Sequence, residues 1–334
     1  MKIATLRGNG LLNNKIFDLD SKENRDNCFE PYVLLRNEFL KVGIILNTAD
    51  LNSGVNVDFE LHQDIQHQAT CALNYLLMFE TSYIIPENQN IYKKYQRIFT
   101  WRDDLVDGDK FIKFNFPNPI SVSFENGWDN RPQFCALIAG NKTLSISDEK
   151  ILYPERVKTI RWFEENASND FFLYGIGWNF PVPKTGIIGR VLTRLNKGFY
   201  SKMGIKPFPS YQGGIAHKKE VLERTKFLIC YENIAEQPGY ITEKIFDAFF
   251  SGCVPVYWGA SNILQYIPQE CFIDRKRFKD TKDLYRYLKG ISETEYINYQ
   301  KNIRKFLLSD RAYQFSSNFF AETIVNHIKN DLSN

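Results

Sequence analysis

The chain has 334 residues, of which 42 are lysine or arginine and 39 are aspartate or glutamate, and its net charge is +3. This near balance argues against a nucleic-acid binder, which would carry a strongly basic surface. A hydrophobic content of 43% with 24% charged residues is typical of a globular protein, and the length suits two domains. No run of 18 apolar residues exists, so we expect no transmembrane segment.

The cysteines and the first residues together predict a cellular location. The cysteines are scattered without a C-x-x-C pair, which favours neither a disulfide framework nor a zinc site. The stretch from Met1 to Gly8 is too polar for a signal peptide. We therefore expect a cytoplasmic protein in a reducing compartment, with a place at the periphery of the inner membrane as the alternative.

The first part of the chain alternates apolar runs with helical spacing, which predicts an α/β domain. Strands are expected at 1–6, 42–46, 57–61, 75–79 and 97–101, and helices at 32–40 and 88–95. The stretch 115–132 is rich in proline, asparagine and glycine and is typical of a linker. We place the first domain at 1–125.

A second α/β domain is expected at 126–315. Strands are predicted at 133–138, 171–175, 227–231 and 254–258, and helices at 153–165, 217–224, 284–288 and 299–308. The stretch 186–204 is basic and weakly patterned, and 210–214 reads as a turn. The segment 316–334 contains an amphipathic run, and we predict a helix there that returns to the first domain.

The most informative segment is a strand, a polar loop, a helix and a second strand between Phe227 and Gly259. Thr242 has the side chain of an N-cap residue, and Gly252 stands where a glycine commonly ends a helix. In such β-α-β units, ligands bind at the carboxyl ends of the strands and at helix N-termini. Six polar residues fall at that end: Glu232, Asn233, Tyr240, Thr242, Glu243 and Lys244.

Lys244 stands in the first turn of the predicted helix, where the helix dipole disfavours a cation by about 0.3–1 kcal/mol. An anion such as a diphosphate docked on the same helix end would explain a lysine there. A solvated ion pair between Glu243 and Lys244 is the competing interpretation.

The motifs Cys230-Tyr-Glu-Asn233, Gly239-Tyr-Ile-Thr-Glu-Lys-Ile-Phe-Asp-Ala-Phe-Phe-Ser-Gly252 and Val254-Pro-Val-Tyr-Trp-Gly259 resemble the signature of the α-1,3/4-fucosyltransferases. The resemblance implies a GT-B fold, in which two Rossmann-like domains face a cleft. It also implies inverting transfer of fucose from GDP-β-L-fucose to a hydroxyl of an oligosaccharide acceptor. The expected acceptor is a lactosamine-type glycan that contains N-acetylglucosamine, and the linkage stays open between α-1,3 and α-1,4.

The same resemblance implies roles for the polar residues of the signature. Lys244 corresponds to the lysine that contacts the donor diphosphate, and Glu243 to the carboxylate that binds the ribose. Asn233, Tyr240 and Thr242 belong to the donor site in the family's motif. Glu232 is included there as well, although its charge would repel a diphosphate, so we expect it to orient a neighbour or the sugar.

Two further residues are needed for the implied reaction. Arg156 matches the family's second cation, with Lys158 and Arg161 as competitors. The general base should come from the first domain, where Glu80 follows a buried strand as a glutamate does in the family. Asp50, at the end of another strand, is the alternative base.

Metal sites and other functions are less well supported. Asp103 and Asp104 are adjacent rather than spaced as D-x-D, and His62 and His67 lack a third ligand. We therefore expect neither a metal nor a cofactor. A GT-B enzyme with another nucleotide sugar, or an inactive carbohydrate-binding protein of this fold, are the competing functions.

Overall fold

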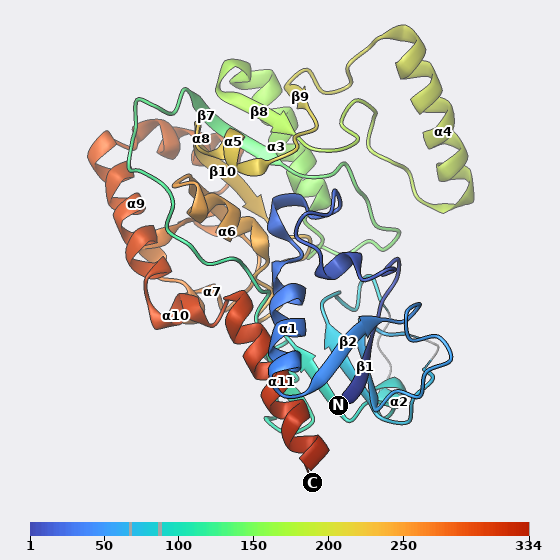
Figure 1. Cartoon of the computed structure of the whole chain (residues 1–334). Coiled ribbons are helices and arrows are strands. Elements are labelled where there is room, and N and C mark those ends of the chain that lie inside the picture. The colour runs from blue at the N-terminus through green and yellow to red at the C-terminus, as the bar shows by residue number, and fades with distance from the viewer. Residues whose placement is uncertain (67–68, 86–88, 334) are drawn as a thin grey trace. The chain divides into compact units, whose positions relative to one another are not determined.

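The computed structural model describes residues 1–66, 69–85 and 89–333. Two compact units emerge, one formed by 1–120, 238–240 and 310–334 and the other by 121–237 and 241–309. Each unit contains a parallel six-stranded sheet, which Figure 1 shows with its helices. The main chain passes from one unit to the other after residue 120 and again after residue 309. The sequence predicted these boundaries after residues 125 and 315. His67 and Asn88 lie outside the described residues.

The sheet of the first unit has the strand order β2-β1-β3-β4-β5-β6. Its strands are β1 (Lys2–Arg7), β2 (Ile44–Thr48), β3 (Phe59–Gln63), β4 (Asn74–Met78), β5 (Arg97–Thr100) and β6 (Phe111–Lys113). All five pairings are parallel. Every residue of β4 is buried, as expected for a central strand of a parallel sheet that is covered on both faces.

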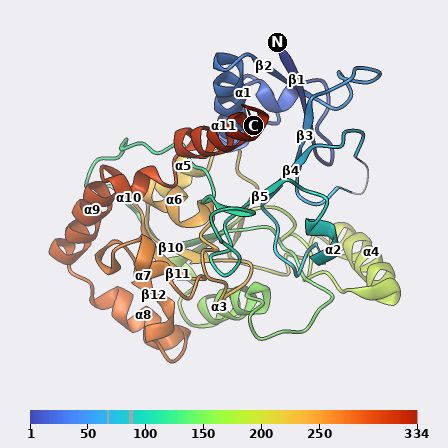
Figure 2. The ribbon, with the colours of Figure 1, turned by 90° about the horizontal axis from the view of Figure 1, so that it is seen from below.

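The helices of the first unit join the beginning of the chain to its end. They are α1 (Glu30–Lys41), α2 (Gln89–Tyr92), α10 (Asp310–Tyr313) and α11 (Ser317–Ser333), with 3₁₀ turns at Lys15–Phe17 and Arg25–Asn27. α11 packs along α1, and Figure 2 shows the two side by side. Phe320 of α11 lies 6.5 Å from the ring of Tyr32 and 5.5 Å from that of Phe114. This aromatic packing holds α11 in the first unit.

A buried polar cluster lies on β3 and its neighbours. The Glu60 carboxylate is completely buried and accepts hydrogen bonds from Arg7 on β1, from Thr70, and from a ring nitrogen of His62 at 2.8 Å. The other nitrogen of His62 lies 3.2 Å from the hydroxyl of Tyr95. Burial raises the pKa of Glu60, but the hydrogen bonds from His62, Arg7 and Thr70 outweigh burial and lower that pKa to about 2.

The sheet of the second unit has the strand order β12-β11-β10-β7-β8-β9. Its strands are β7 (Gln133–Ile138), β8 (Phe171–Tyr174), β9 (Tyr211–Gly213), β10 (Thr225–Tyr231), β11 (Val254–Trp258) and β12 (Ile273–Asp274). All five pairings are again parallel. The turn predicted at 210–214 is wrong in part, because Tyr211–Gly213 pairs with β8 as an edge strand.

The helices of the second unit are α3 (Tyr153–Asn166), α4 (Gly186–Met203), α5 (Lys218–Leu222), α6 (Glu243–Phe250), α7 (Ile263–Tyr266), α8 (Thr281–Gly290) and α9 (Glu293–Leu307). Three 3₁₀ turns accompany them, at Ser168–Asp170, Gln269–Cys271 and Arg275–Arg277. The core includes stacked rings of Phe163 and Phe171, 4.6 Å apart. The weak pattern assigned to 186–204 is corrected, because an 18-residue helix occupies almost all of it. None of the described helices is both long and apolar enough to cross a membrane.

The signature segment forms the predicted β-α-β unit from β10, α6 and β11. Ile245, Ala248 and Phe249 on α6 are fully buried, as their spacing predicts. Gly252 follows the helix with φ of +63°, the left-handed conformation that glycine adopts without strain. β10 and β11 pair in register from Phe227 and Val254 onward. The polar loop after β10 therefore lies at the carboxyl edge of the sheet.

The Glu60 cluster predicts a pH dependence of stability. A carboxyl whose folded pKa is lowered contributes stability above its unfolded pKa, and that contribution is lost as the pH falls toward the folded value. We expect the free energy of unfolding of wild type to exceed that of Glu60→Gln by about 3 kcal/mol near pH 6. Near pH 3 this difference should be smaller by about 2 kcal/mol. Thermal unfolding of both proteins across this range measures the difference.

The exposed Glu23 of the same unit supplies the matched control, because Glu23→Gln should leave the pH profile of wild type unchanged. A constant difference between wild type and Glu60→Gln over the whole range would contradict the lowered pKa of Glu60.

Candidate functional site

The candidate site is built around a buried ion pair at the end of β10. Glu232 directly follows the strand and is completely buried. Its carboxylate accepts the backbone N–H of Thr242 at 2.8 Å, the hydroxyl of Thr242 at 2.8 Å and the ammonium of Lys244 at 3.0 Å. Glu232 thus ties the end of the strand to the first turn of α6.

The sequence interpretation places Glu232 with the donor-binding residues and expects it to orient a neighbour or the sugar. In the structure its oxygens accept hydrogen bonds from Thr242 and Lys244, so the carboxylate orients these two residues. Thr242 differs in detail from its expected role. It stands at the N-cap position of α6, but its hydroxyl bonds Glu232 instead of capping the helix.

Lys244 keeps its charge because two carboxylates surround it. Its ammonium lies 3.0 Å from Glu232 and 3.7 Å from Glu243. Burial lowers the pKa of Lys244, but the charges of Glu232 and Glu243 outweigh burial, so the pKa is raised. The side chain retains 21% exposure, so a charged group reaches the surface at this edge of the sheet.

Arg156 brings a second cation to the same edge. This residue of α3 is buried, and its guanidinium donates to the carbonyl of Tyr231 at 2.6 Å and to the side-chain oxygen of Asn233 at 3.0 Å. Its charge opposes that of Lys244 and tends to lower the pKa of the lysine. The two cations therefore lie close enough to act on one anion.

The structure also separates Arg156 from its two competitors on α3. Lys158 is exposed and pairs with Glu155 at 2.6 Å. Arg161 pairs with Glu164 at 2.7 Å and covers the ring of Phe208 at 4.0 Å. Of the three, Arg156 is the one that bonds the residues at the end of β10.

Glu243 presents a second carboxylate beside Lys244, with about half of its side chain exposed. Desolvation raises the pKa of Glu243, but Lys244 and then Lys218 outweigh it, and the pKa falls to about 2. Glu243 is therefore ionised and, unlike Glu232, open to a ligand that offers hydroxyl groups.

Tyr240 lies in a different environment from the one expected. The segment 238–240 belongs to the first compact unit, where the Tyr240 ring packs 4.8 Å from Trp101 and 5.7 Å from Phe116. The side chain is 3% exposed. The structure thus groups Arg156, Asn233, Thr242, Glu243 and Lys244 around Glu232 and assigns Tyr240 to the aromatic core of the first unit.

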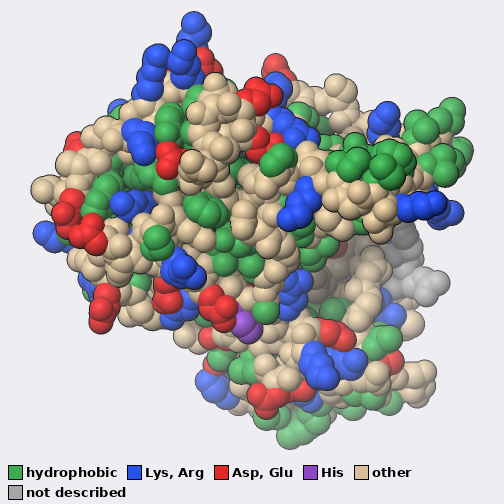
Figure 3. Space-filling view, turned by 90° about the horizontal axis from the view of Figure 1, so that it is seen from above, with side chains coloured by type: hydrophobic (Ala, Val, Ile, Leu, Met, Phe, Trp, Pro, Cys, Tyr) green, Lys and Arg blue, Asp and Glu red, His purple; other side chains and the backbone are tan. Residues whose placement is uncertain are grey.

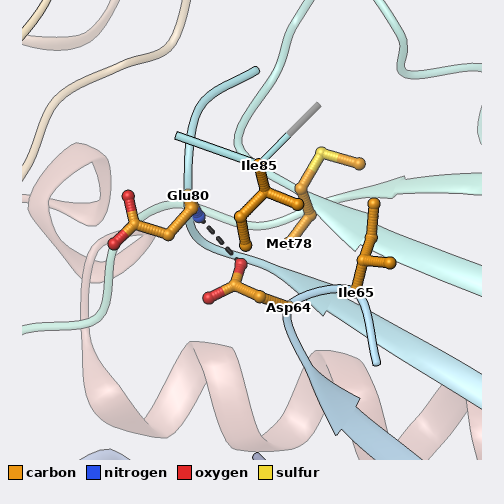
Figure 4. Close-up of a pocket in the computed structure, with 5 residues that line it drawn as sticks. All are labelled: Asp64, Ile65, Met78, Glu80 and Ile85. Carbon is orange, nitrogen blue, oxygen red and sulfur yellow. Dashed lines mark hydrogen bonds between the residues drawn. The ribbon is translucent and has the colours of Figure 1, made fainter. Parts of the chain in front are cut away.

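The predicted base Glu80 stands just after β4 in the first unit. One oxygen of Asp64 accepts the backbone N–H groups of Phe79 and Glu80, both at 2.8 Å. Together with Ile65, Met78 and Ile85, these two acids line a small pocket. Figure 4 shows the Glu80 carboxylate directed away from that of Asp64, so Asp64 holds the backbone of Glu80 and leaves its side chain to point elsewhere.

Asp50, the alternative base, lies after β2 at the edge of the same sheet. Strand β2 is three positions from β4, about 14 Å at the usual strand spacing. A hydrogen bond from Thr48 is the main cause that lowers the pKa of Asp50, and its carboxylate also accepts the N–H of Asn13 at 2.8 Å. This environment makes Asp50 a weaker base, so the two candidates are distinct positions with different chemistry.

Two residues near the site were missed by the sequence interpretation. Arg275 directly follows β12, is buried and donates to the Tyr231 hydroxyl at 3.0 Å. Lys218, the first residue of α5, pairs with Asp247 of α6 at 2.7 Å and lowers the pKa of Glu243. The signal for Arg275 was a run of three basic residues after a short apolar stretch. Lys218 carried no such signal.

The carboxylates once considered for metal binding are engaged by cations. Asp103 pairs with Lys113 at 2.6 Å, and Asp104 accepts from Arg102 at 3.0 Å. Within 1–66, 69–85 and 89–333, no group of three histidine, cysteine or acidic side chains is placed to hold a metal ion. The charge available to an anion at this site comes from lysine and arginine.

Solved structures of known glycosyltransferases share this fold. The structure resembles that of an α1,3-fucosyltransferase with GDP-fucose, with a TM-score of 0.53 and 15% identity over 98% of this chain and 89% of that one. It also resembles the structure of Anabaena HepE in complex with UDP and glucose, with a TM-score of 0.55 and 9% identity over 99% of this chain and 100% of that one. Two parallel α/β units of this kind constitute the GT-B fold of glycosyltransferases.

Part of the sequence is similar to one family of glycosyltransferases. Residues 202–325 match the family model for the C-terminal part of glycosyltransferase family 10 (fucosyltransferase). A stretch of 75 residues is 36% identical to the α-(1,3)-fucosyltransferase FucT of Helicobacter pylori. This stretch covers 22% of this chain and 16% of the Helicobacter protein. The resemblance to the fucosyltransferases is thus confirmed over residues 202–325, and this matched stretch contains Glu232, Glu243 and Lys244.

From the two cations at this edge of the sheet we predict that Lys244 contributes to the binding of GDP. Replacing Lys244 by methionine should weaken binding of GDP by about 10- to 100-fold, because a hydrogen bond to a charged group contributes about 1.5–3 kcal/mol. Isothermal titration calorimetry measures the affinity. Lys158→Met on the exposed face of α3 is the matched control and should bind GDP like wild type.

The same change leaves Glu232 buried without its partner, which lowers stability. The double variant Glu232→Gln, Lys244→Met should therefore regain thermal stability but not the affinity for GDP. Wild-type affinity in Lys244→Met would place the diphosphate away from this lysine.

Proposed function

We propose that this protein transfers fucose from GDP-β-L-fucose to a lactosamine-type glycan that contains N-acetylglucosamine. The product would carry an inverted α-1,3 linkage, with α-1,4 as the other possibility. The observation that carries the proposal is the presence of two cations, Arg156 and Lys244, at the end of β10, and both β10 and Lys244 lie within the segment that matches the fucosyltransferase family model. The names of the relatives support both linkages, because the Helicobacter protein is an α-(1,3)-fucosyltransferase and an equally similar Arabidopsis protein is an α-(1,4)-fucosyltransferase.

Departure of GDP requires positive charge that is already in place. Lys244 is held by Glu232 and Thr242, and Arg156 by Tyr231 and Asn233, so neither needs to reorganise when the leaving diphosphate gains charge. Oriented charges of this kind are often the largest contribution to catalysis. Glu243, ionised and half exposed, is suited to accept hydrogen bonds from the two ribose hydroxyls.

The acceptor hydroxyl must lose its proton as it attacks, and we assign this step to Glu80. Its backbone is fixed by Asp64, and the carbonyl of the preceding Phe79 accepts the indole N–H of Trp101 at 3.0 Å. A base on a fixed backbone loses little entropy when the acceptor docks. The proton moves from the acceptor oxygen to the Glu80 carboxylate while the bond between fucose and the diphosphate breaks.

We propose a cytoplasmic location. Four of the six cysteines are buried in the structure. Burial raises the pKa of the Cys135 and Cys230 thiols well above the ordinary value, which makes them poor nucleophiles for disulfide exchange. Such cysteines suit a reducing compartment.

One competing function has an observation in its favour. The likeness to Anabaena HepE, which binds UDP and glucose, is as high as the likeness to the fucosyltransferase. At such low identity the fold alone does not select a nucleotide or a sugar, so a GT-B enzyme with a UDP-sugar is the alternative. An inactive carbohydrate-binding protein is less consistent with the retained Lys244, Arg156 and Glu80.

A donor panel tests the proposal. The protein is incubated with N-acetyllactosamine and, in separate reactions, with GDP-fucose, GDP-mannose, UDP-glucose or UDP-galactose, and products are identified by mass spectrometry and NMR. We expect α-linked fucose from GDP-fucose alone. The rate should be the same in excess EDTA and with added Mn²⁺, because lysine and arginine balance the diphosphate. Transfer from a UDP-sugar, or complete loss in EDTA that Mn²⁺ restores, would overturn the respective part of the proposal.

The assignment of the base is tested by two variants. Glu80→Gln should reduce transfer by about 10²- to 10⁴-fold, the usual contribution of a positioned base. Its affinity for GDP should stay that of wild type, because the diphosphate site belongs to the second unit. Asp50→Asn should stay active. An active Glu80→Gln with an inactive Asp50→Asn would move the base to Asp50.

A further inference from the structure

Helix α4 of the second unit exposes an apolar face. Figure 1 shows it between two long loops, projecting from its unit. Seven apolar side chains are exposed on it: Ile187, Ile188, Val191, Leu192, Leu195, Phe199 and Met203. Four of them, Ile188, Leu192, Leu195 and Phe199, follow the spacing of three or four residues that lines one face of a helix. Leu195 and Phe199 are 64% and 54% exposed, so the described residues of the second unit leave this face uncovered.

The opposite side of α4 attaches the helix to its own unit. Gly189 is its one buried residue, and the Thr193 hydroxyl accepts the N–H of Lys184 at 2.9 Å. Lys197, one turn further on, lies 5.5 Å from the ring of Phe180. This small and polar strip faces the preceding loop. The orientation of α4 is therefore fixed with its apolar face toward solvent.

The segment is also strongly basic. Between 184 and 206 the chain has six cations and no acidic residue, although the whole protein has a net charge of only +3. These cations are Lys184, Arg190, Arg194, Lys197, Lys202 and Lys206. Figure 3 shows hydrophobic side chains gathered at the margin where α4 lies, with lysine and arginine around them. An exposed apolar face of this size commonly marks a binding surface.

We propose that α4 docks this protein on an anionic lipid bilayer, lying in the plane of the interface. Apolar side chains on one face and cations without acidic neighbours are the features of interfacial helices. Lysine and arginine stems can extend along the apolar surface and bring their charges to the headgroups. A second copy of the chain is a poorer occupant, because two copies of the segment 184–206 would bring twelve cations together, six from each.

The bilayer surface complements both properties of α4. Phosphate headgroups balance its cations, and the acyl chain boundary covers its apolar face. α4 lies apart in the sequence from every residue assigned to donor binding or to proton transfer, so docking does not depend on the identity of the donor. It would place the second unit at a membrane surface, where lipid-linked or membrane-associated acceptors are accessible.

Vesicle co-sedimentation tests the proposal. The full chain is mixed with phosphatidylcholine vesicles, with or without phosphatidylglycerol. We expect binding to the vesicles that contain phosphatidylglycerol and weaker binding at high salt. The double variant Arg190→Gln, Arg194→Gln should partition roughly 30-fold less well, since each cation near an anionic surface contributes about fivefold. The double variant Leu195→Glu, Phe199→Glu should bind these vesicles about 100-fold less well or worse.

Leu308→Glu is the matched control, because Leu308 is 74% exposed in the same unit but lies outside α4. It should bind vesicles like wild type. Circular dichroism and light scattering on each variant report folding and oligomeric state. Absence of vesicle binding by wild type, or equal binding by Leu195→Glu, Phe199→Glu, would overturn the proposal. So would a dimer that dissociates in that variant, because a second copy would then cover the face.

Discussion

The geometry of the site depends on one buried ion pair, that of Glu232 with Lys244. The Glu232 carboxylate at the end of β10 is completely buried, and burying a charge is unfavourable unless it is paired and hydrogen-bonded. Thr242 and Lys244 donate the hydrogen bonds that offset this cost. Removing one partner of such a pair typically costs about 3–5 kcal/mol, because the other charge stays buried and unpaired. The pair therefore fixes where α6 begins relative to β10.

Neighbouring residues reinforce that constraint. Gly259, at the end of β11, lies so close that a Cβ there would come within 2.5 Å of Glu232 Cγ and 2.4 Å of the Tyr257 hydroxyl. The thiol of Cys230 donates to the carbonyl of Lys244 at 3.3 Å. The motifs that resemble the fucosyltransferases are thus largely the packing around one carboxylate, and they hold Lys244 in place for a ligand.

The two units use a buried glutamate in different ways. In the first unit, Glu60 is surrounded by Arg7, His62 and Thr70, and its charge is balanced by partners directed at it. In the second unit, Lys244 lies between Glu232 and Glu243 and keeps 21% exposure, and Arg156 donates to the carbonyl of Tyr231 and the side-chain oxygen of Asn233. These two cations stand at an edge of the sheet that a ligand can reach, whereas the Glu60 carboxylate is completely buried. The Glu60 cluster therefore contributes to stability, and the cations around Glu232 are suited to binding a ligand.

The sequence by itself determined the local and periodic features. Strand β10, the buried face of α6 and the glycine after it follow from apolar runs, helical spacing and the left-handed preference of Gly252, which act between near neighbours. The same motifs carried the resemblance to the fucosyltransferases, since they lie close together in the sequence. The tertiary structure decided which side chains meet. Only folding buried Glu232, selected Arg156 over Lys158 and Arg161, and joined Tyr240 to Trp101, because these contacts join residues that are distant in the sequence. The apolar spacing on α4 was present in the sequence as well, but whether that face is covered depends on every other element of the unit, and only the structure could show that it is exposed.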